Sequence, residues 1–344
     1  MSLTTEQLKG LTLGRYEFRL RACEDVSLPT FPGSTRRGSF GHALKAIACS
    51  VEHQDRYRCL LAEACLYPNI FEPSALPING TEKKQADPPR LFLFQPPLPR
   101  VAEAISTIEN NKRAWSEKHI PLKAGESFSF GMTLFGTAIS KLPYIVYAVE
   151  LMARHGLGFA RVPFGLEEVL IVNERNESLC IYTPQMTRIT PHKTKLKTLC
   201  DLVEHRLAQM SFNDSLTLLF ITPTWVEIRK YVLESVTFGQ LVTRLSWRMA
   251  QVFELYGEAP LLYDYKTLIE QSATVETINE NLWFHQFERF ANRTQSKKPL
   301  RGFLGAITYR GETIKELLSL IIAGEFLQLG RETAFGLGRY WTLA

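Results

Sequence analysis

The 344-residue chain lacks any long hydrophobic run. No stretch approaches the roughly 20 consecutive apolar residues that a membrane-spanning helix needs, so we expect no contact with the bilayer interior. The opening residues, MSLTTEQLKG, resemble neither a signal peptide nor a transit peptide. With only 6 cysteines and no secretion signal, the sequence predicts reduced thiols in a cytoplasmic protein.

A large excess of charge of one sign is also missing. The net charge is +5, and 45% hydrophobic and 22% charged residues are ordinary for a soluble globular protein. A mildly basic chain suits an anionic partner but does not require one. At this length, two domains with sizeable cores are expected.

The first half of the sequence predicts a strand and a helix, then an excursion, then a strand–helix–strand segment. Residues 13–22 alternate apolar and charged side chains, as a half-buried strand does, with Tyr16, Phe18, Leu20 and Ala22 on one face. The other predicted elements are a helix over 36–52, a proline-rich excursion over 72–100 with a strand at 90–94, a strand over 127–136, a helix over 144–156 and a strand over 166–173.

The second half repeats this plan after a polar, proline-containing linker at 183–198. It predicts a strand over 215–223, a helix over 238–257, a strand over 303–311, a helix over 312–324 ended by Gly324, and strands over 326–330 and 337–344. The fold class is therefore α+β, with tandem ferredoxin-like (RRM-like) domains at 1–190 and 191–344. Sheets of this kind recur in RNA-binding modules.

The second predicted domain ends in a glycine-rich loop at 330–338, within GRETAFGLGRY. Gly330, Gly336 and Gly338 can adopt positive φ and let a phosphate backbone approach closely, while Arg331 and Arg339 supply fixed charge. The sequence thus favours RNA contact at this loop over a turn with solvated arginines. The same reasoning allows Phe335 and Tyr340 to stack on bases, although Tyr340 could equally face the core.

The segment LGRETAFGLGRY resembles the C-terminal glycine-rich loop of the RAMP proteins of CRISPR systems, most closely the Cas6 pre-crRNA endoribonucleases. The resemblance extends over roughly half of the chain in family order. Its other segments are FPGSTRRGSFGHALKAIAC, CLLAEACLYPNIFEP, FITPTWVEIRKY, LSWRMAQVFELYG and FANRTQSKKPLRGFLGAI.

The resemblance implies an endoribonuclease that needs no metal and no other cofactor and that cuts CRISPR repeat RNA (pre-crRNA). The 2′-hydroxyl attacks the neighbouring phosphate and leaves 2′,3′-cyclic phosphate and 5′-hydroxyl ends. Repeat RNA, a CRISPR effector complex and a homodimer are the partners it suggests. The alternatives are a non-catalytic RAMP subunit that holds crRNA and a general single-stranded RNA binder.

His42 is the candidate for proton transfer. Histidine suits that role near neutral pH, and lysine or arginine suits stabilisation of the phosphorane. His42 lies opposite the apolar stripe of the first predicted helix, with Lys45 one turn on and Arg36 and Arg37 at the helix entry. The first helix also bears the catalytic histidine in a number of Cas6 proteins, so the resemblance favours His42, Lys45 and Arg37 as catalytic residues. The alternatives are an ordinary exposed histidine and, as a second candidate, His155.

A different class of enzyme is excluded by a missing element. His192 in HKT matches the H-x-T element of two-histidine phosphoesterases, but that chemistry needs two such elements. No second H-x-T or H-x-S occurs in the sequence.

Basic residues outside the loop are candidates for phosphate contact. Arg36 lies at the start of the first predicted helix, and NRTQSKKPLR precedes the last strand–helix–strand unit. A charge run is often only a solvated loop, but these lie in segments that resemble an RNA-binding family. The predicted RNA-binding set is Arg36, Arg293, Lys297, Lys298, Arg301, Gly330, Arg331, Gly336, Gly338 and Arg339.

Cys49, Cys59 and Cys65, with His53 between them, suggest zinc ligands. Related proteins often have a further cysteine where this chain has Arg56, which weakens that interpretation. We therefore predict no metal and treat these cysteines as small apolar residues, with a structural zinc as the alternative.

Overall fold

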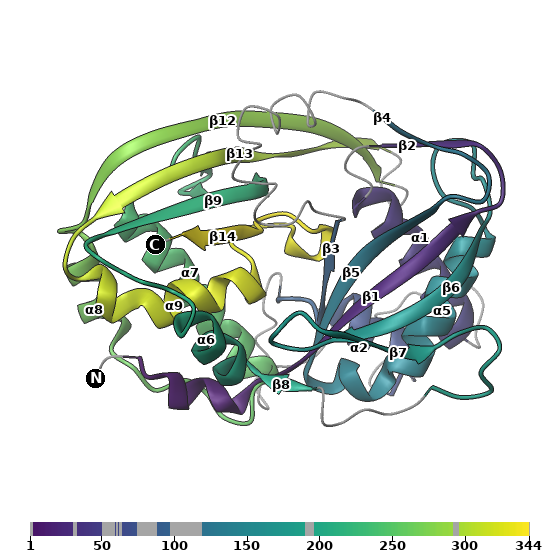
Figure 1. Cartoon of the computed structure of the whole chain (residues 1–344), viewed down its shortest axis with the longest axis horizontal. Coiled ribbons are helices and arrows are strands. Elements are labelled where there is room, and N and C mark those ends of the chain that lie inside the picture. The colour runs from purple at the N-terminus through teal and green to yellow at the C-terminus, as the bar shows by residue number, and fades with distance from the viewer. Residues whose placement is uncertain are drawn as a thin grey trace. The chain divides into compact units, whose positions relative to one another are not determined.

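In a computed structural model of the chain, the described residues are 3–29, 33–49, 59, 61, 64–73, 88–96, 119–189, 196–291 and 296–343. They fall into two compact units (Figure 1). The N-unit comprises Leu13–Pro97 and Glu117–Leu196, and the C-unit comprises Met1–Thr12 and Lys197–Ala344. The first residues of the chain thus group with its second half. A domain boundary at residues 190 and 191 remains a prediction.

The N-unit is a ferredoxin-like βαββαβ fold. Its elements are β1 (Thr12–Ala22), α1 (Gly33–Ala48), β3 (Phe92–Gln95), β5 (Ser127–Phe135), α5 (Leu142–Arg154) and β6 (Phe164–Val172). The sheet order is β3-β5-β1-β6, extended by β7 (Ser178–Tyr182), and the pairs are antiparallel. The four core strands thus follow the order second, third, first, fourth. Smaller elements are β2 (Val26–Pro29), α2 (Leu66–Phe71), β4 (His119–Leu122) and η3 (Gly136–Lys141).

The alternation in β1 produces the predicted two-faced strand. Tyr16, Phe18, Leu20 and Ala22 are buried, and the Phe18 ring stacks on Phe130 of β5 with 5.4 Å between centroids. On the opposite face, Arg19 pairs with Glu168 at 2.5 Å and Arg21 pairs with Glu167, whereas Arg15 donates to the Asn173 carbonyl and to Asn176 Oδ1. The apolar face thus builds the core, and the charged face stays at the surface.

The C-unit repeats the same topology. Its elements are β9 (Ser215–Thr224), α7 (Phe238–Tyr256), β12 (Glu276–Ala291), β13 (Ser296–Arg310), α9 (Ile314–Leu327) and β14 (Tyr340–Leu343). The sheet order is β12-β13-β9-β14, again second, third, first, fourth, with α7 and α9 on one face (Figure 1). Additional elements are η1 (Thr5–Gly10), β8 (Lys197–Thr198), α6 (Leu199–Leu207), β10 (Glu227–Ile228), β11 (Tyr231–Val232), α8 (Tyr265–Ser272) and η5 (Thr333–Phe335). The predicted α+β fold of tandem ferredoxin-like domains is confirmed.

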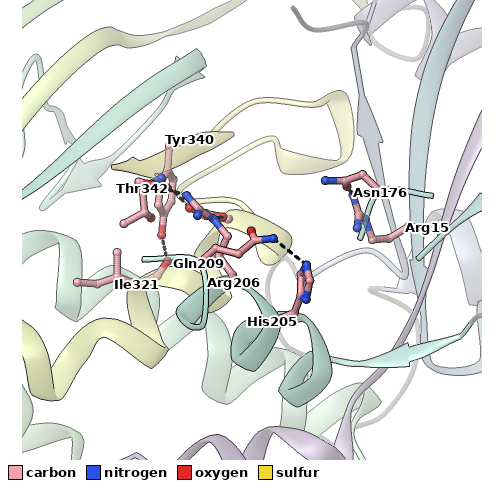
Figure 2. A network of polar contacts seen from close by, with 9 residues as sticks. Arg15, Asn176, His205, Arg206, Gln209, Ile321, Tyr340 and Thr342 are labelled. Carbon is pink, nitrogen blue, oxygen red and sulfur yellow. Dashed lines mark hydrogen bonds and ion pairs between the residues drawn. The ribbon is translucent and has the colours of Figure 1, made fainter. Parts of the chain in front are cut away.

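The prediction that the last helix ends at Gly324 is wrong, as is the strand over 326–330. Helix α9 continues to Leu327, and it ends at Gln328, which has a positive φ of 60°. A Cβ atom at Gly324 would overlap the Tyr340 hydroxyl and lie 2.6 Å from Leu245. The glycine therefore permits close packing inside the helix. Figure 2 shows the Tyr340 hydroxyl donating to the Ile321 carbonyl.

Other predicted elements also differ from the structure in their bounds. The first helix was predicted over 36–52, whereas α1 begins at Gly33 and ends at Ala48; residues 50–58 lie outside the described residues. The excursion over 72–100 is described only in part, and it contains β3. The predicted linker ends in β8 and in Thr198, whose hydroxyl caps α6.

Within the described part of the chain, no helix combines the length and the apolar character needed to cross a membrane.

Candidate nucleic-acid interface

The glycine loop lies in the C-unit, between α9 and β14, and its backbone is built around glycine. Gly330 has φ 86°, and a Cβ atom there would overlap the Trp225 carbonyl oxygen. Gly338 has φ 79°, and its Cβ atom would overlap the Leu329 carbonyl. Both positions therefore need glycine for the conformation and for the close approach of the protein's own backbone. The amide of Gly338 donates to the Pro223 carbonyl at 3.0 Å, which fixes the loop to the end of β9.

The middle of the loop packs inward. Phe335 is 3% exposed and Tyr340 is fully buried. Neither ring therefore offers a face to a base, and Tyr340 takes the core alternative that the sequence left open. The side chains that reach the surface are those of Arg331, which is exposed, and of Glu332 and Arg339, which are half-buried.

A buried arginine, which the sequence did not indicate, holds the loop in place. Arg248 of α7 is 8% exposed; its Nε donates to the Leu327 carbonyl at 2.6 Å, and its Nη2 donates to Thr333 Oγ1 at 2.9 Å. Burial lowers the pKa of Arg248 to about 10. The side chain stays charged at neutral pH and supplies directional donors where α9 meets the loop.

Trp225 brings two predicted RNA-binding residues together. The guanidinium carbons of Arg301 and Arg331 lie 5.1 Å and 5.4 Å from the Trp225 ring centroid. Both distances are within cation–π range. Arg331 also donates from its backbone to the Trp225 carbonyl at 2.9 Å and from Nη1 to Glu227 Oε2 at 2.8 Å. This half-buried indole therefore concentrates two fixed positive charges beside the loop.

Three other basic residues of the predicted RNA-binding set, Arg339, Lys297 and Lys298, are also described in the C-unit. Arg339 lies 5.2 Å from the Trp341 ring, and its backbone amide donates to Thr222 Oγ1 at 2.9 Å. Lys297 and Lys298 are exposed on β13. Lys297 pairs with Glu288 at 3.0 Å, so part of its charge is neutralised.

These lysines lie on a two-stranded ribbon. Strand β13 pairs with β12 from Ser296 onward, whereas its pairing with β9 starts at Phe303. Residues 296–302 therefore extend past the end of β9. Arg293 lies outside the described residues.

The predicted catalytic residues lie on α1 of the N-unit. Phe40 and Leu44 are buried, and the Phe40 ring packs on Phe92 and Phe94 at 5.5 Å and 5.7 Å. His42 and Lys45 are on the exposed side of the helix, as the spacing predicts.

The two arginines at the start of α1 are placed differently. The Arg37 guanidinium carbon lies 4.4 Å from the ring centroid of Phe71, on the packed side of the helix. Arg36 lies in α1, but its side chain is outside the described part of the structure. The catalytic and binding roles of these residues remain predictions.

The cysteine cluster gives no described metal site. Cys49 is exposed, Cys59 and Cys65 are half-buried, and His53 lies outside the described residues. Among the described side chains, no three His, Cys, Asp or Glu residues are grouped closely enough to hold a metal ion.

Two residues that shape the candidate interface, Trp225 and Arg248, were not identified by sequence reasoning. Each lies in a segment that carries the family resemblance, FITPTWVEIRKY or LSWRMAQVFELYG. Their position in these segments was the signal in the sequence that could have identified them. Neither residue belongs to a motif with its own chemistry.

Two family models match the sequence. A model named AF_1859_N, described as an N-terminal domain, matches residues 11–194, which is more than half of the chain. The model of CRISPR-associated endoribonuclease Cas6 matches residues 218–340, a range that includes Trp225, Arg301 and the glycine loop. No curated protein matches the chain.

Solved structures with the same fold include several Cas6 proteins. A Cas6 (TTHB231) product complex aligns with TM-score 0.52 and 15% identity over 96% of this chain and 99% of that chain. Thermus thermophilus Cas6 (TTHB231) aligns with TM-score 0.51 and 15% identity over 97% of this chain and 99% of that chain. A chain of a partial Cas6-RT-Cas1–Cas2 complex aligns with TM-score 0.52 and 11% identity over 96% of this chain and 46% of that chain. At these identities, the likeness shows the shared tandem ferredoxin-like fold.

Proposed function

The chain belongs to the Cas6 family of RAMP proteins, with an AF_1859_N N-terminal domain, and from this premise we propose that it is a metal-independent endoribonuclease that matures CRISPR RNA. The match to the endoribonuclease model over residues 218–340 is the observation that carries the proposal. Binding or processing of CRISPR RNA is the general role of the family. Cleavage through a 2′,3′-cyclic phosphate is the specific chemistry proposed for this chain.

The proposed reaction divides its tasks between the two units. In the N-unit, the exposed His42 transfers a proton at the 2′-oxygen or the leaving 5′-oxygen, and Lys45, one helical turn away, stabilises the phosphorane. Arg37 is the third residue proposed for catalysis. In the C-unit, Arg301 and Arg331 on Trp225, together with Arg339, bind the phosphate backbone of the repeat. Arg36, Arg293, Lys297 and Lys298 extend this proposed binding set.

Incubation of the purified protein with its repeat RNA in EDTA tests the proposal. We expect cleavage, 2′,3′-cyclic phosphate and 5′-hydroxyl ends, and loss of the cut when the nucleotide 5′ to the scissile phosphate is 2′-deoxy. His42→Ala should lower the cleavage rate by about 10²-fold while RNA affinity stays unchanged. His205→Ala is the matched control, because His205 is a half-buried helical histidine of the C-unit that contacts Gln209 at 3.0 Å.

A non-catalytic subunit that holds crRNA is the alternative. Tight, repeat-specific binding without product in the EDTA assay would contradict the endoribonuclease proposal and support the non-catalytic subunit. Normal cleavage by His42→Ala would assign proton transfer to another group, with His155 as the next candidate.

Partners beyond RNA are a separate part of the proposal. The fold is shared with the Cas6 portion of a Cas6-RT-Cas1–Cas2 complex, which favours assembly with other CRISPR proteins. A homodimer remains a prediction that the mass of the purified protein in solution would test.

A further inference from the structure

The hairpin formed by β10 and β11 has an unusual turn in the C-unit. Glu227 pairs with Val232 and Ile228 pairs with Tyr231, so Arg229 and Lys230 are the two central residues of the turn. Their φ values are 49° and 71°. A two-residue turn with both φ values positive has the type I′ geometry, for which Asn-Gly, Asp-Gly and Gly-Gly are the favoured sequences.

Two long cationic side chains thus occupy positions that favour small or flexible residues. L-residues with a Cβ are destabilised in the left-handed region, and such strain tends to persist where a functional constraint requires it. Both residues are exposed. Replacing them with the favoured residues would relieve the strain, so their local conformation does not explain their presence.

The hairpin is fixed to the cationic surface around Trp225. Glu227 at its base accepts from Arg331 Nη1 at 2.8 Å, and the Glu227 carbonyl accepts from Arg244 Nη2 at 2.5 Å. Trp225, two residues before β10, accepts from the Arg331 amide at 2.9 Å. The turn therefore projects from the same backbone that holds Arg331. Its nearest acidic residue in the sequence is already paired with an arginine.

An exposed aromatic residue follows the cations directly. Tyr231 is 77% exposed at the start of β11. Stacking of bases on aromatic rings combined with cationic contacts to the backbone is the usual arrangement in proteins that bind single-stranded nucleic acid. An acidic peptide would use the cations but would gain less from the ring.

We infer that the Arg229–Lys230 turn and Tyr231 form a second contact for single-stranded RNA, beside the glycine loop, in which the cations bind phosphates and the ring stacks on an unpaired base. This inference rests on the proposed function, because it takes the repeat RNA as the ligand. It adds three residues that the sequence motifs did not indicate.

The double variant Arg229→Asn/Lys230→Gly tests the role of the cations and keeps a favourable turn. We expect the melting temperature to rise by about 2–4 °C, because the favoured type I′ sequence relieves strain. RNA affinity should fall about tenfold, and the slope of log K against log salt should decrease by about 1.4, or 0.7 for each phosphate that the variant no longer neutralises. If the variant is more stable but binds RNA more weakly, the loss of affinity does not come from misfolding.

Lys266→Gln/Lys315→Gln is the matched control, since it removes two charges from exposed positions on α8 and α9 of the same unit. It should leave the salt slope within about 0.3 of the wild-type slope. Tyr231→Ala should lower affinity for repeat RNA about tenfold, whereas Tyr231→Phe should retain it. An abasic scan of the RNA should reveal one position at which Tyr231→Ala causes no additional loss.

The outcomes separate this inference from the proposed nuclease. Wild-type affinity and salt slope in Arg229→Asn/Lys230→Gly overturn the inference, even when the protein cuts RNA normally. Weakened binding by this variant, together with a wild-type protein that makes no product, supports the inference and overturns the nuclease. If Arg229→Asn/Lys230→Gly binds RNA as the wild type does but fails to capture purified CRISPR proteins, the RNA contact is overturned and the turn is a protein contact.

Discussion

Arg248 of α7 and Thr333 of the glycine loop are joined by a hydrogen bond of 2.9 Å in the interior of the C-unit. The same guanidinium caps the end of α9 through the Leu327 carbonyl at 2.6 Å. One side chain of α7 therefore contacts both the end of α9 and the glycine loop that follows it. The position of Arg331 and Arg339 at the loop ends depends on this interior contact.

Arg248→Ala should destabilise the C-unit by about 3 kcal/mol, because two buried acceptors lose their donor and a cavity forms. Denaturant unfolding measures the loss. Repeat-RNA affinity should fall at temperatures where the protein is still folded, since the loop loses one of its attachments. Arg310→Ala, which removes an exposed ion pair with Asp214 at 3.4 Å, should cost under about 1 kcal/mol. Equal costs for the two variants would contradict the assigned role of Arg248.

Gly324→Ala should destabilise the protein by about 1–3 kcal/mol, although alanine favours a helix elsewhere. The added methyl group would overlap the Tyr340 hydroxyl. Gly38→Ala in α1 is the matched control: among the described residues, no atom beyond its chain neighbours and its own helix backbone lies within 4 Å of the position that its methyl group would take, so a gain of about 0.5–1 kcal/mol is expected. In the double variant Gly324→Ala/Tyr340→Phe, the missing hydroxyl should recover part of the loss. Strict additivity of the two single changes would argue against the contact.

Periodicity predicted the sheets and main helices because it reports burial directly. The alternating side chains of β1 and the apolar stripe of α7 gave elements whose observed bounds, Thr12–Ala22 and Phe238–Tyr256, lie within one residue of those predicted. Strand β12 was missed because its side chains at 276–288 are exposed or half-buried and its sequence shows no apolar alternation. Its existence depends on backbone pairing with β13, which no local pattern records.

The site was predictable to the extent that charge and glycine indicate it. The sequence identified Arg301 and Arg331, but it could not indicate that Trp225 brings them together, because that arrangement depends on tertiary contacts between β13 and the loop. Gly324 shows the opposite error. A glycine after a helical run suggests a C-cap, but close packing against Tyr340 requires it inside the helix.

Glu325→Gln should flatten the dependence of stability on pH. Burial raises the pKa of Glu325 above its ordinary value of 4.5, and the nearby Arg206 and the Thr342 amide offset this only in part. A raised folded-state pKa means that its contribution to stability is complete below about 4.5 and is lost as the pH rises through the raised value. Melting temperatures between about pH 4 and pH 8 should therefore decline more in the wild type than in the variant. Parallel curves for the two proteins would contradict the raised pKa.

Lys45→Ala should lower the cleavage rate by about 10²-fold with little change in RNA affinity, because a cation that stabilises the phosphorane acts mainly in the transition state. Single-turnover cleavage and filter binding measure the two quantities. Lys45→Arg should keep part of the rate. Lys141→Ala removes another exposed lysine of the N-unit and should leave both quantities unchanged. Loss of affinity equal to the loss of rate would make Lys45 a binding residue.

Trp225→Ala should weaken RNA binding about tenfold, because Arg301 and Arg331 lose the ring that orders them. Trp225→Phe should retain most of the affinity, since a phenyl ring still interacts with both guanidinium groups. Trp247→Phe, on the exposed side of α7, is the control for fluorescence: RNA should alter the emission of the wild type and of this variant alike, whereas Trp225→Phe should lose much of the response and keep only the part from Trp341 beside Arg339. A full response without Trp225 would show that RNA lies elsewhere, and the cationic surface around the glycine loop would then need another ligand.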